Sequence, residues 1–257
     1  MRPTLLVALL ALALPAVGLA QSANLHSGAI PADVASAVND PARHEDQALD
    51  ARRKVALIMT FAEVKPGQKV LELIPGSGYF TRVFSALVGP QGHVYTVWPN
   101  EAAKYSAESF AKWTALAAQP HYANVSLLKQ PAAELSAPEP VDLVFTSQNY
   151  HDYPDPFMGS VDPLVLNRQA FAALKPGGLF VVIDHVAPAG SGMADTNTLH
   201  RIDPAIVKQQ VETAGFVFDG ESNALRNSAD PHTAKVFDKS IRGHTDQFIY
   251  RFRKPAQ

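Results

Sequence analysis

The chain has 257 residues, a formal net charge of -2, 47% hydrophobic residues and no cysteine. This length and apolar content suit a single α/β domain with a large core. The near-neutral charge argues against a general nucleic-acid-binding protein, which usually carries a basic patch. The lack of cysteine excludes disulfides and the attachment of a lipid through a cysteine.

The first residues have the pattern of a secretory signal peptide. Arg2 is followed by an apolar run over residues 5–14, and Gly18-Leu19-Ala20 places small residues ahead of a cleavage site. The apolar run is shorter than the ~20 residues of a membrane-spanning helix, although an uncleaved anchor is the alternative. We therefore expect residues 1–20 to be removed, leaving a periplasmic or secreted protein with no stable membrane insertion.

The remaining chain is predicted to form a short arm and one domain. Residues 21–43 are weakly patterned and are expected to be a flexible N-terminal arm, followed by a single domain over residues 44–257. Residues 45–61 have helical periodicity. They include the basic cluster Arg52-Arg53-Lys54, which we interpret as a solvated helix face in preference to an anion-binding site.

Seven segments have the apolar patterns of strands. They are residues 69–73, 93–97, 125–129, 141–145, 179–183, 216–218 and 248–252. Helical patterns lie between them over residues 80–87, 102–118 and 163–174, and a further helix begins at Asp203-Pro204. Buried strands that alternate with helices predict a mostly parallel sheet built from right-handed βαβ units.

The turn between the first strand and the next helix carries the first functional signal. Glu72 and Leu73 are followed by Ile74-Pro75-Gly76-Ser77-Gly78 and then by a helix with one apolar face. In an open α/β sheet such a turn lies at the carboxyl ends of the strands, where ligands bind. Its glycines allow a ligand to approach the backbone, and the helix start presents unpaired N–H groups. A strand–helix turn without a ligand is the alternative interpretation.

This turn resembles the first motif of class I S-adenosylmethionine-dependent methyltransferases, which usually reads acid-X-Gly-X-Gly-X-Gly. Glu72, Gly76 and Gly78 match the motif, and Ile74 stands in place of the first glycine. The resemblance covers about residues 45–254. It implies a Rossmann-like α/β fold with seven strands, helices on both faces and an antiparallel last strand. It also implies that S-adenosylmethionine is the cofactor, with cofactor-binding residues at Glu72, Ile74, Pro75, Gly76, Ser77, Gly78, Trp98 and Asn149.

Two positions depart from the pattern of that family. An acid usually ends the second strand, where one carboxylate can accept from two ribose hydroxyls, but Trp98 stands there. Asn100 or Glu101 are candidates to replace this acid if the chain turns back, and Trp98 is a candidate to stack on the adenine or to pack under a loop. After the third strand, Pro131 stands where the family usually has an aspartate.

The loop after the fourth strand has the most distinctive polar sequence, Asn149-Tyr150-His151-Asp152. The same string resembles a poorly characterised group of predicted methyltransferases of bacterial envelopes, in which this loop is implied to face the methyl group and the substrate. His151 can take a proton near neutral pH, and Asp152 is placed to orient it. We therefore predict Tyr150, His151 and Asp152 as catalytic residues and no metal. A polar loop with a helix-capping aspartate is the alternative.

The leading hypothesis is an exported S-adenosylmethionine-dependent methyltransferase that acts on an unknown small molecule. One alternative is an exported, non-catalytic ligand-binding protein with a degenerate methyltransferase fold, suggested by Ile74, Trp98 and Pro131. A second is a metal-assisted hydrolase that uses His151, Asp152 and His185, since Asp184-His185 ends a neighbouring strand.

Overall fold

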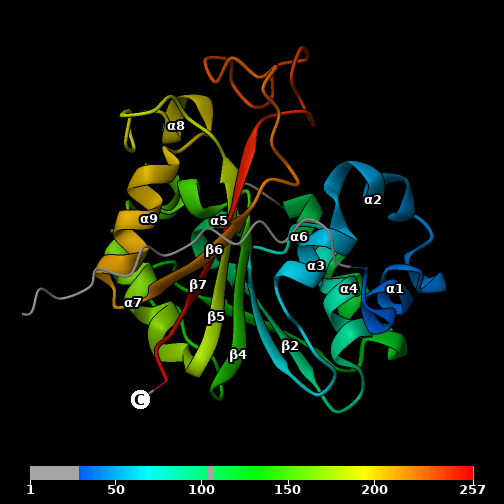
Figure 1. Cartoon of the computed structure of the whole chain (residues 1–257). Helices are drawn as coiled ribbons and strands as arrows, with labels where there is room; N and C mark the ends of the chain where they lie inside the picture. Colours follow the sequence, from blue (N-terminus) through cyan, green and yellow to red (C-terminus); the bar gives the residue numbers. More distant parts are fainter. Residues whose placement is uncertain (1–28, 104–106, 257) are drawn as a thin grey trace, which may run out of the picture.

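The computed structural model describes residues 29–103 and 107–256, and its centre is a seven-stranded sheet (Figure 1). The expected signal peptide lies outside the described residues. The strand order is β3-β2-β1-β4-β5-β7-β6, with β7 antiparallel to both of its neighbours and the other pairs parallel. The strands are β1 Lys69–Leu73, β2 His93–Pro99, β3 Val125–Gln130, β4 Val141–Ser147, β5 Leu174–His185, β6 Val217–Ser222 and β7 Gln247–Arg253. The predicted seven-stranded α/β fold with an antiparallel last strand is therefore confirmed.

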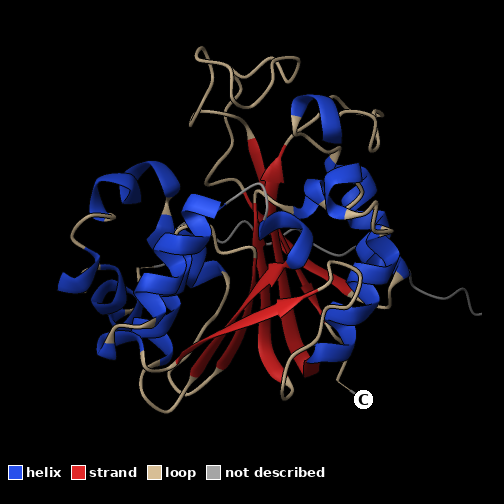
Figure 2. Ribbon diagram, turned by 180° about the vertical axis from the view of Figure 1, so that it is seen from behind, coloured by secondary structure: helices blue, strands red, loops and turns tan. Residues whose placement is uncertain are grey.

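Helices cover both faces of the sheet, as the two opposite views show (Figures 1 and 2). One layer contains α1 Ala32–Val38, α2 Gln47–Arg53, α3 Val55–Phe61, α4 Tyr79–Val88 and α6 Ala107–Ala117. The other contains α7 Pro163–Ala173, α8 Thr196–Leu199 and α9 Pro204–Thr213, and the short α5 Asn100–Ala103 follows β2. Each layer closes its own apolar cluster against the sheet, so the central strands are buried on both faces. Within the described ranges, no helix is long and apolar enough to cross a bilayer.

The expectation of a flexible arm over residues 21–43 is wrong for residues 32–43. Helix α1 buries Val34 and Ala37 in the same apolar cluster as α3 and α4. The short 3-10 helix Pro41–Arg43 follows, and the buried Arg43 forms an ion pair with Asp50 at 2.9 Å. These contacts make residues 32–43 part of the domain.

The helix predicted over residues 45–61 is divided at Lys54, which ends α2 and precedes α3. Lys54 has a φ of +52°, in the left-handed region, so the helix is interrupted there and α2 and α3 are separate helices. This turn gives the basic cluster two environments. Arg52 donates to the carbonyl of Gly243 on the surface, whereas Arg53 is half-buried beside the carboxyl end of β1.

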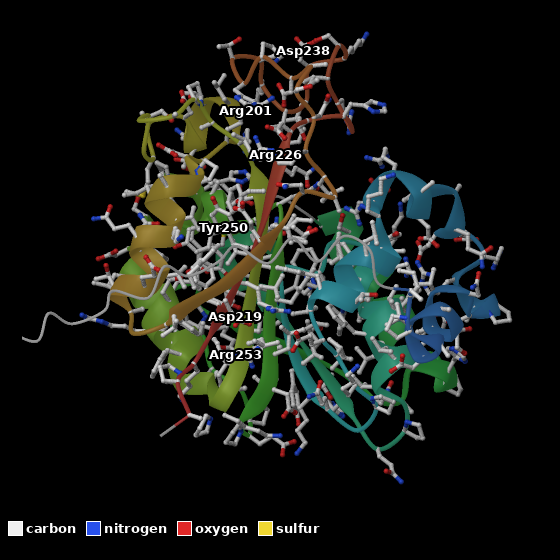
Figure 3. The ribbon with its side chains drawn as sticks, viewed as in Figure 1. Arg201, Asp219, Arg226, Asp238, Tyr250 and Arg253 are labelled. Atoms are coloured by element: carbon white, nitrogen blue, oxygen red, sulfur yellow. The ribbon has the colours of Figure 1, made fainter. Side chains whose placement is uncertain are left out.

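The connection between β6 and β7, residues 223–246, forms no helix or strand and lies beyond the carboxyl ends of the parallel strands (Figure 1). A buried ion pair attaches it to the domain. Arg201 donates to both oxygens of Asp230 at 2.8 and 3.0 Å, and both side chains are fully buried. Figure 3 shows Arg201 and Arg226 where this connection meets the domain and Asp238 at its outer end. Although irregular, the segment is therefore a fixed cover over one edge of the sheet.

Candidate functional site

The turn after β1 keeps the left-handed backbone that glycine normally provides. Ile74 has a φ of +49°, Gly76 of +59° and Gly78 of +86°, and α4 begins directly afterwards. A β-branched residue in this region is an outlier that costs about 1–3 kcal/mol. The amide of Ile74 donates to the carbonyl of Val97 at 2.9 Å, which helps to hold the strained residue. The motif thus retains its turn although its first glycine is replaced.

Glu72 is the buried carboxyl group of the site. Its side chain accepts a hydrogen bond from Thr81 Oγ1 at 2.5 Å and is almost completely shielded from water. Burial raises the pKa of Glu72 to about 7, and the hydrogen bond from Thr81 and the charges of Arg82 and Arg53 only partly oppose this shift. A cationic ligand beside Glu72 would therefore favour the ionised carboxylate.

A cavity of about 210 Å³ lies beside this turn at the carboxyl ends of β1 and β4. Six of the eight predicted cofactor-binding residues line it: Glu72, Ile74, Pro75, Gly76, Trp98 and Asn149. The other two do not. The carbonyl of Ser77 accepts from Arg82, and Gly78 packs close to Leu116. The cavity is smaller than the ~300–1,000 Å³ of typical small-molecule sites, so it must widen to hold a whole nucleoside-bearing ligand.

Arg53 lines the same cavity and was not predicted as a site residue. Its guanidinium lies 4.4 Å from the ring centroid of Tyr79 and 5.2 Å from that of Phe80. Burial lowers the pKa of Arg53, while Tyr79, Asp46 and Glu72 oppose that shift. In the sequence, the basic cluster Arg52-Arg53-Lys54 was the only indication of a cationic site residue. The turn at Lys54 in the structure shows that Arg53 is the member of this cluster that lines the cavity.

Trp98 forms an apolar wall of the cavity in place of the usual acid. Its ring is fully buried and nearly perpendicular to that of Phe110, at 5.4 Å between centroids, and its Nε1 has no hydrogen-bond partner among the described residues. An unpaired buried donor is rare in native proteins and is consistent with a missing ligand. Glu101 does not replace the acid, because its carboxylate accepts from the amide of Ala132 at 2.9 Å and does not line the cavity.

Tyr150 lies away from the cavity. Its hydroxyl accepts from Asn167 Nδ2 at 2.8 Å and donates to Gln210 Oε1 at 3.1 Å. The side chain is fully buried within the apolar cluster under α7 and α9. These contacts suit a packing residue, and the predicted catalytic role of Tyr150 stays a prediction.

His151 is buried between two carboxylates. Its Nδ1 lies 2.8 Å from Asp184 Oδ1, and its Nε2 lies 3.2 Å from Asp152 Oδ1. Burial opposes the charged form, but Asp184 and Asp152 outweigh it and raise the pKa of His151 to about 10. Burial likewise opposes ionisation of Asp152, yet hydrogen bonds from His151 and His200 hold the pKa of Asp152 well below its usual range. Both ring nitrogens of His151 therefore face carboxylates, and its predicted role as a base stays a prediction.

His185, the third member of the hydrolase alternative, points elsewhere. Its Nδ1 lies 2.7 Å from Thr245 Oγ1, and its ring centroid is 6.0 Å from that of His151. Burial lowers the pKa of His185 to about 4, so its ring is neutral. The histidine that approaches Asp152 is instead His200, whose Nδ1 lies 3.7 Å from Asp152 Oδ1. The sequence did not single out His200 for this position.

Backbone strain is concentrated around this region. Three of the seven described non-glycine residues with positive φ are Ile74, Gln148 and His200. Ile74 and Gln148 line the cavity, and His200 approaches Asp152. Because strained residues persist where function requires them, this clustering supports a functional site along the carboxyl edge of the sheet.

Comparisons with known proteins find relatives that match part of the chain. The family model described as protein-L-isoaspartate(D-aspartate) O-methyltransferase matches residues 37–129. A protein-L-isoaspartate O-methyltransferase from Ignicoccus hospitalis is 49% identical over 51 residues, 20% of this chain and 24% of the relative. Another from Methanothrix thermoacetophila is 31% identical over 154 residues, 58% of this chain and 60% of the relative. The chain thus matches less than two thirds of the length of these curated relatives.

The fold also has solved neighbours. A crystal structure of a SAM-dependent methyltransferase from Aquifex aeolicus matches with a TM-score of 0.55 and 19% sequence identity. The match covers 86% of this chain and 98% of that protein. At this identity the likeness establishes the fold, while the chemistry has to be argued from the site.

Proposed function

We propose that this chain, which belongs to the class I S-adenosylmethionine-dependent methyltransferases, transfers a methyl group from S-adenosylmethionine to an acceptor. The observation that carries the proposal is the cavity beside Glu72, where the strained turn of residues 74–78 meets the carboxyl ends of β1 and β4. The match of residues 37–129 to a methyltransferase family supports it, because that range contains Glu72, the turn, Trp98 and Arg53.

The residues present suit the cofactor chemically. S-adenosylmethionine carries a sulfonium, an ammonium and a carboxylate, and the cavity combines the acidic Glu72 with the basic Arg53. Arg53 would bind the carboxylate, and Glu72 would accept from the polar groups of the ligand. Trp98, which lines the cavity, adds a buried donor without a partner in the described ranges, its Nε1. The cofactor supplies an activated methyl group when bound.

The chain would contribute mainly by positioning. Transfer of a methyl group from a sulfonium requires alignment of the acceptor with the carbon, and orientation alone can supply much of the rate. Asn149 links the two sides of the site, since it lines the cavity and its Nδ2 donates to Asp152 Oδ2 at 3.3 Å. An acceptor near Asp152 would therefore lie next to the cofactor.

A small acceptor fits the site better than a protein chain. The family match ends at residue 129, before the loops around His151 and His200 and the β6–β7 connection. Those segments leave His151 buried and Asp152 and His200 only slightly exposed. The isoaspartate acceptor named for the relatives would have to enter under this cover as part of a polypeptide. For this reason we favour a small molecule.

Replacing Gly76 by alanine is expected to weaken the binding of S-adenosylmethionine about tenfold, or about 1.4 kcal/mol. The new Cβ would lie on the wall of the cavity, and the backbone at a φ of +59° disfavours any side chain. Calorimetry of the purified protein with S-adenosylmethionine measures the change. The matched control is Gly67→Ala, because Gly67 has a φ of +82°, has open space around it and is remote from the cavity.

Both substitutions should lower the free energy of unfolding by a similar amount, about 1 kcal/mol, because both force alanine into the left-handed region. Only Gly76→Ala should affect cofactor binding. If the unmodified protein gives neither heat nor thermal stabilisation with S-adenosylmethionine, the proposal fails and the ligand-binding alternative gains support.

We also propose that the protein is exported, as residues 1–20 suggest. The support is the pattern of a charged start, an apolar run and small residues at positions 18 and 20. Mass spectrometry of protein expressed in a Gram-negative host should give a mature chain that begins at Gln21. A chain that keeps residues 1–20 and stays in the cytoplasm would contradict export.

A further inference from the structure

Three side chains around Asp152, where we place the methyl acceptor, bring potential metal ligands together. They are His151 and Asp152, from the 3-10 helix Tyr150–Asp152 after β4, and His200, which follows α8. One ligand atom of each lies within 4.8 Å of the other two. The histidines approach the same oxygen of Asp152, at 3.2 Å from His151 Nε2 and 3.7 Å from His200 Nδ1.

These separations suit a single small cation. Around a tetrahedral zinc ion with bonds of about 2.0–2.1 Å, neighbouring ligand atoms are about 3.3 Å apart. The two measured separations lie on either side of that value, so small rotations of the side chains would complete the set. Two imidazoles and one carboxylate also form a ligand set that catalytic zinc sites use, with one position left open.

Neighbouring residues hold the ligands in the required orientation. The buried Asp184 accepts from both Nδ1 and the backbone amide of His151, each at 2.8 Å, which leaves Nε2 as the nitrogen available to an ion. Such a carboxylate behind a histidine is the usual support of metal-binding imidazoles. Asn149 donates to Asp152 Oδ2 and leaves Oδ1 toward the histidines.

A buried carboxyl oxygen beside the cluster also lacks a partner in the part of the chain that the structure describes. The carboxylates of Asp152, Asp155 and Asp184 surround the two imidazoles. Asp155 is buried and interacts electrostatically with His151, Asp152 and His200, yet its Oδ2 has no hydrogen-bond partner among the described residues. A buried carboxylate oxygen without a partner is costly, and a nearby positive ion would reduce that cost.

His200 is held in place at the expense of backbone strain. Its φ is +55°, and its amide donates to the carbonyl of Thr196 at 3.0 Å. Phe237 of the β6–β7 connection lies beside the imidazole, with ring centroids 4.9 Å apart. The strained conformation brings Nδ1 toward Asp152 and thus adds a second, independent sign of function.

We propose that His151 Nε2, Asp152 Oδ1 and His200 Nδ1 bind one divalent transition-metal ion, with Zn²⁺ as the preferred metal. Imidazole ligands favour zinc and its neighbours over magnesium or calcium, which take oxygen ligands. If the proposed methyl transfer is correct, the ion would lie beside Asn149, which lines the cofactor cavity and donates to Asp152, and would bind an oxygen atom of the acceptor.

The test is a titration of the chelator-treated full chain with Co²⁺, which reports tetrahedral coordination through its visible absorption. We expect binding of one equivalent and displacement by Zn²⁺, since zinc binds such sites more tightly than cobalt. Loss of a supporting residue typically weakens metal sites 10–100-fold, so His200→Gly should weaken binding at least about a hundredfold. Glycine accepts the left-handed backbone of His200 without strain, which keeps the variant folded.

The matched control is His232→Gly. His232 also has a positive φ, of +61°, and its Nε2 also contacts a carboxylate, Asp246 at 2.9 Å, but it is outside the cluster. It should bind Co²⁺ as the unmodified protein does. No saturable Co²⁺ binding by the unmodified protein, or equal binding by the His200→Gly variant, would overturn the metal site. Because the titration needs no S-adenosylmethionine, its result is independent of the proposed methyl transfer.

Discussion

Replacing Asp230 by alanine is expected to lower the free energy of unfolding by about 3–5 kcal/mol, the usual result of breaking a buried ion pair. The substitution leaves the guanidinium of Arg201 buried without its carboxylate, because both side chains are fully shielded from water. Arg201 would keep only its bonds to the carbonyls of Val186 and Ala234. The amides of Asp246 and His232, which donate to Asp230, would also lose their acceptors. Urea unfolding followed by tryptophan fluorescence measures the change.

Asp238→Ala is the control for this prediction, since Asp238 belongs to the same connection but lies on its exposed outer end (Figure 3). Its carboxylate accepts only from the amide and hydroxyl of Ser240, so its loss should cost about 1 kcal/mol or less. A loss below about 1 kcal/mol for Asp230→Ala would mean that the β6–β7 connection is attached by other contacts.

The fold could be predicted because its signals are local. Each buried strand is a continuous apolar run, and Gly, Pro or an acidic cap marks the ends of the neighbouring helices. The resemblance carried by Glu72, Gly76 and Gly78 also agrees with the methyltransferase family model, which matches residues 37–129. The motif survives the change at Ile74 because tertiary contacts hold this residue in the conformation that glycine would adopt.

The errors arise where long-range contacts decide the structure. Helix α1 buries only Val34 and Ala37, too few positions for a periodic pattern, so its sequence resembled a mobile arm. Neither Gly nor Pro marks the turn at Lys54, and without that turn Arg53 could not be placed in the cavity.

The residues around Asp152, where we place the methyl acceptor, were predicted least well for the same reason. His151 and Asp152 were found from their unusual sequence, but His200 reaches them from a loop far along the chain. Its position depends on the left-handed turn after α8 and on Phe237 of the β6–β7 connection. Neither contact leaves a pattern in the residues next to His200, so the sequence favoured His185, which ends the neighbouring strand.

Glu72→Gln is expected to remove a pH dependence of stability worth about 3 kcal/mol, since each pKa unit corresponds to about 1.4 kcal/mol. Glu72 has an ordinary pKa of 4.5 in the unfolded chain and a pKa of about 7 in the folded one. The folded state therefore keeps a proton that the unfolded state releases. The stability from this group is fully present below pH 4.5 and is lost as the pH rises through about 7.

The difference in unfolding free energy between the two proteins isolates this group, because all other titrating residues are shared. Near pH 4 the proteins should be about equally stable, since glutamine resembles the protonated carboxyl and can still accept from Thr81. Near pH 8 the Gln variant should be the more stable by about 3 kcal/mol, because only the unmodified protein then buries a charge. We expect the ionised carboxylate of Glu72 to interact with the cofactor, so the Gln variant should also bind S-adenosylmethionine more weakly. A difference that does not change between pH 4 and 8 would mean that Arg53 and Arg82 keep Glu72 ionised throughout, with no penalty for a ligand to relieve.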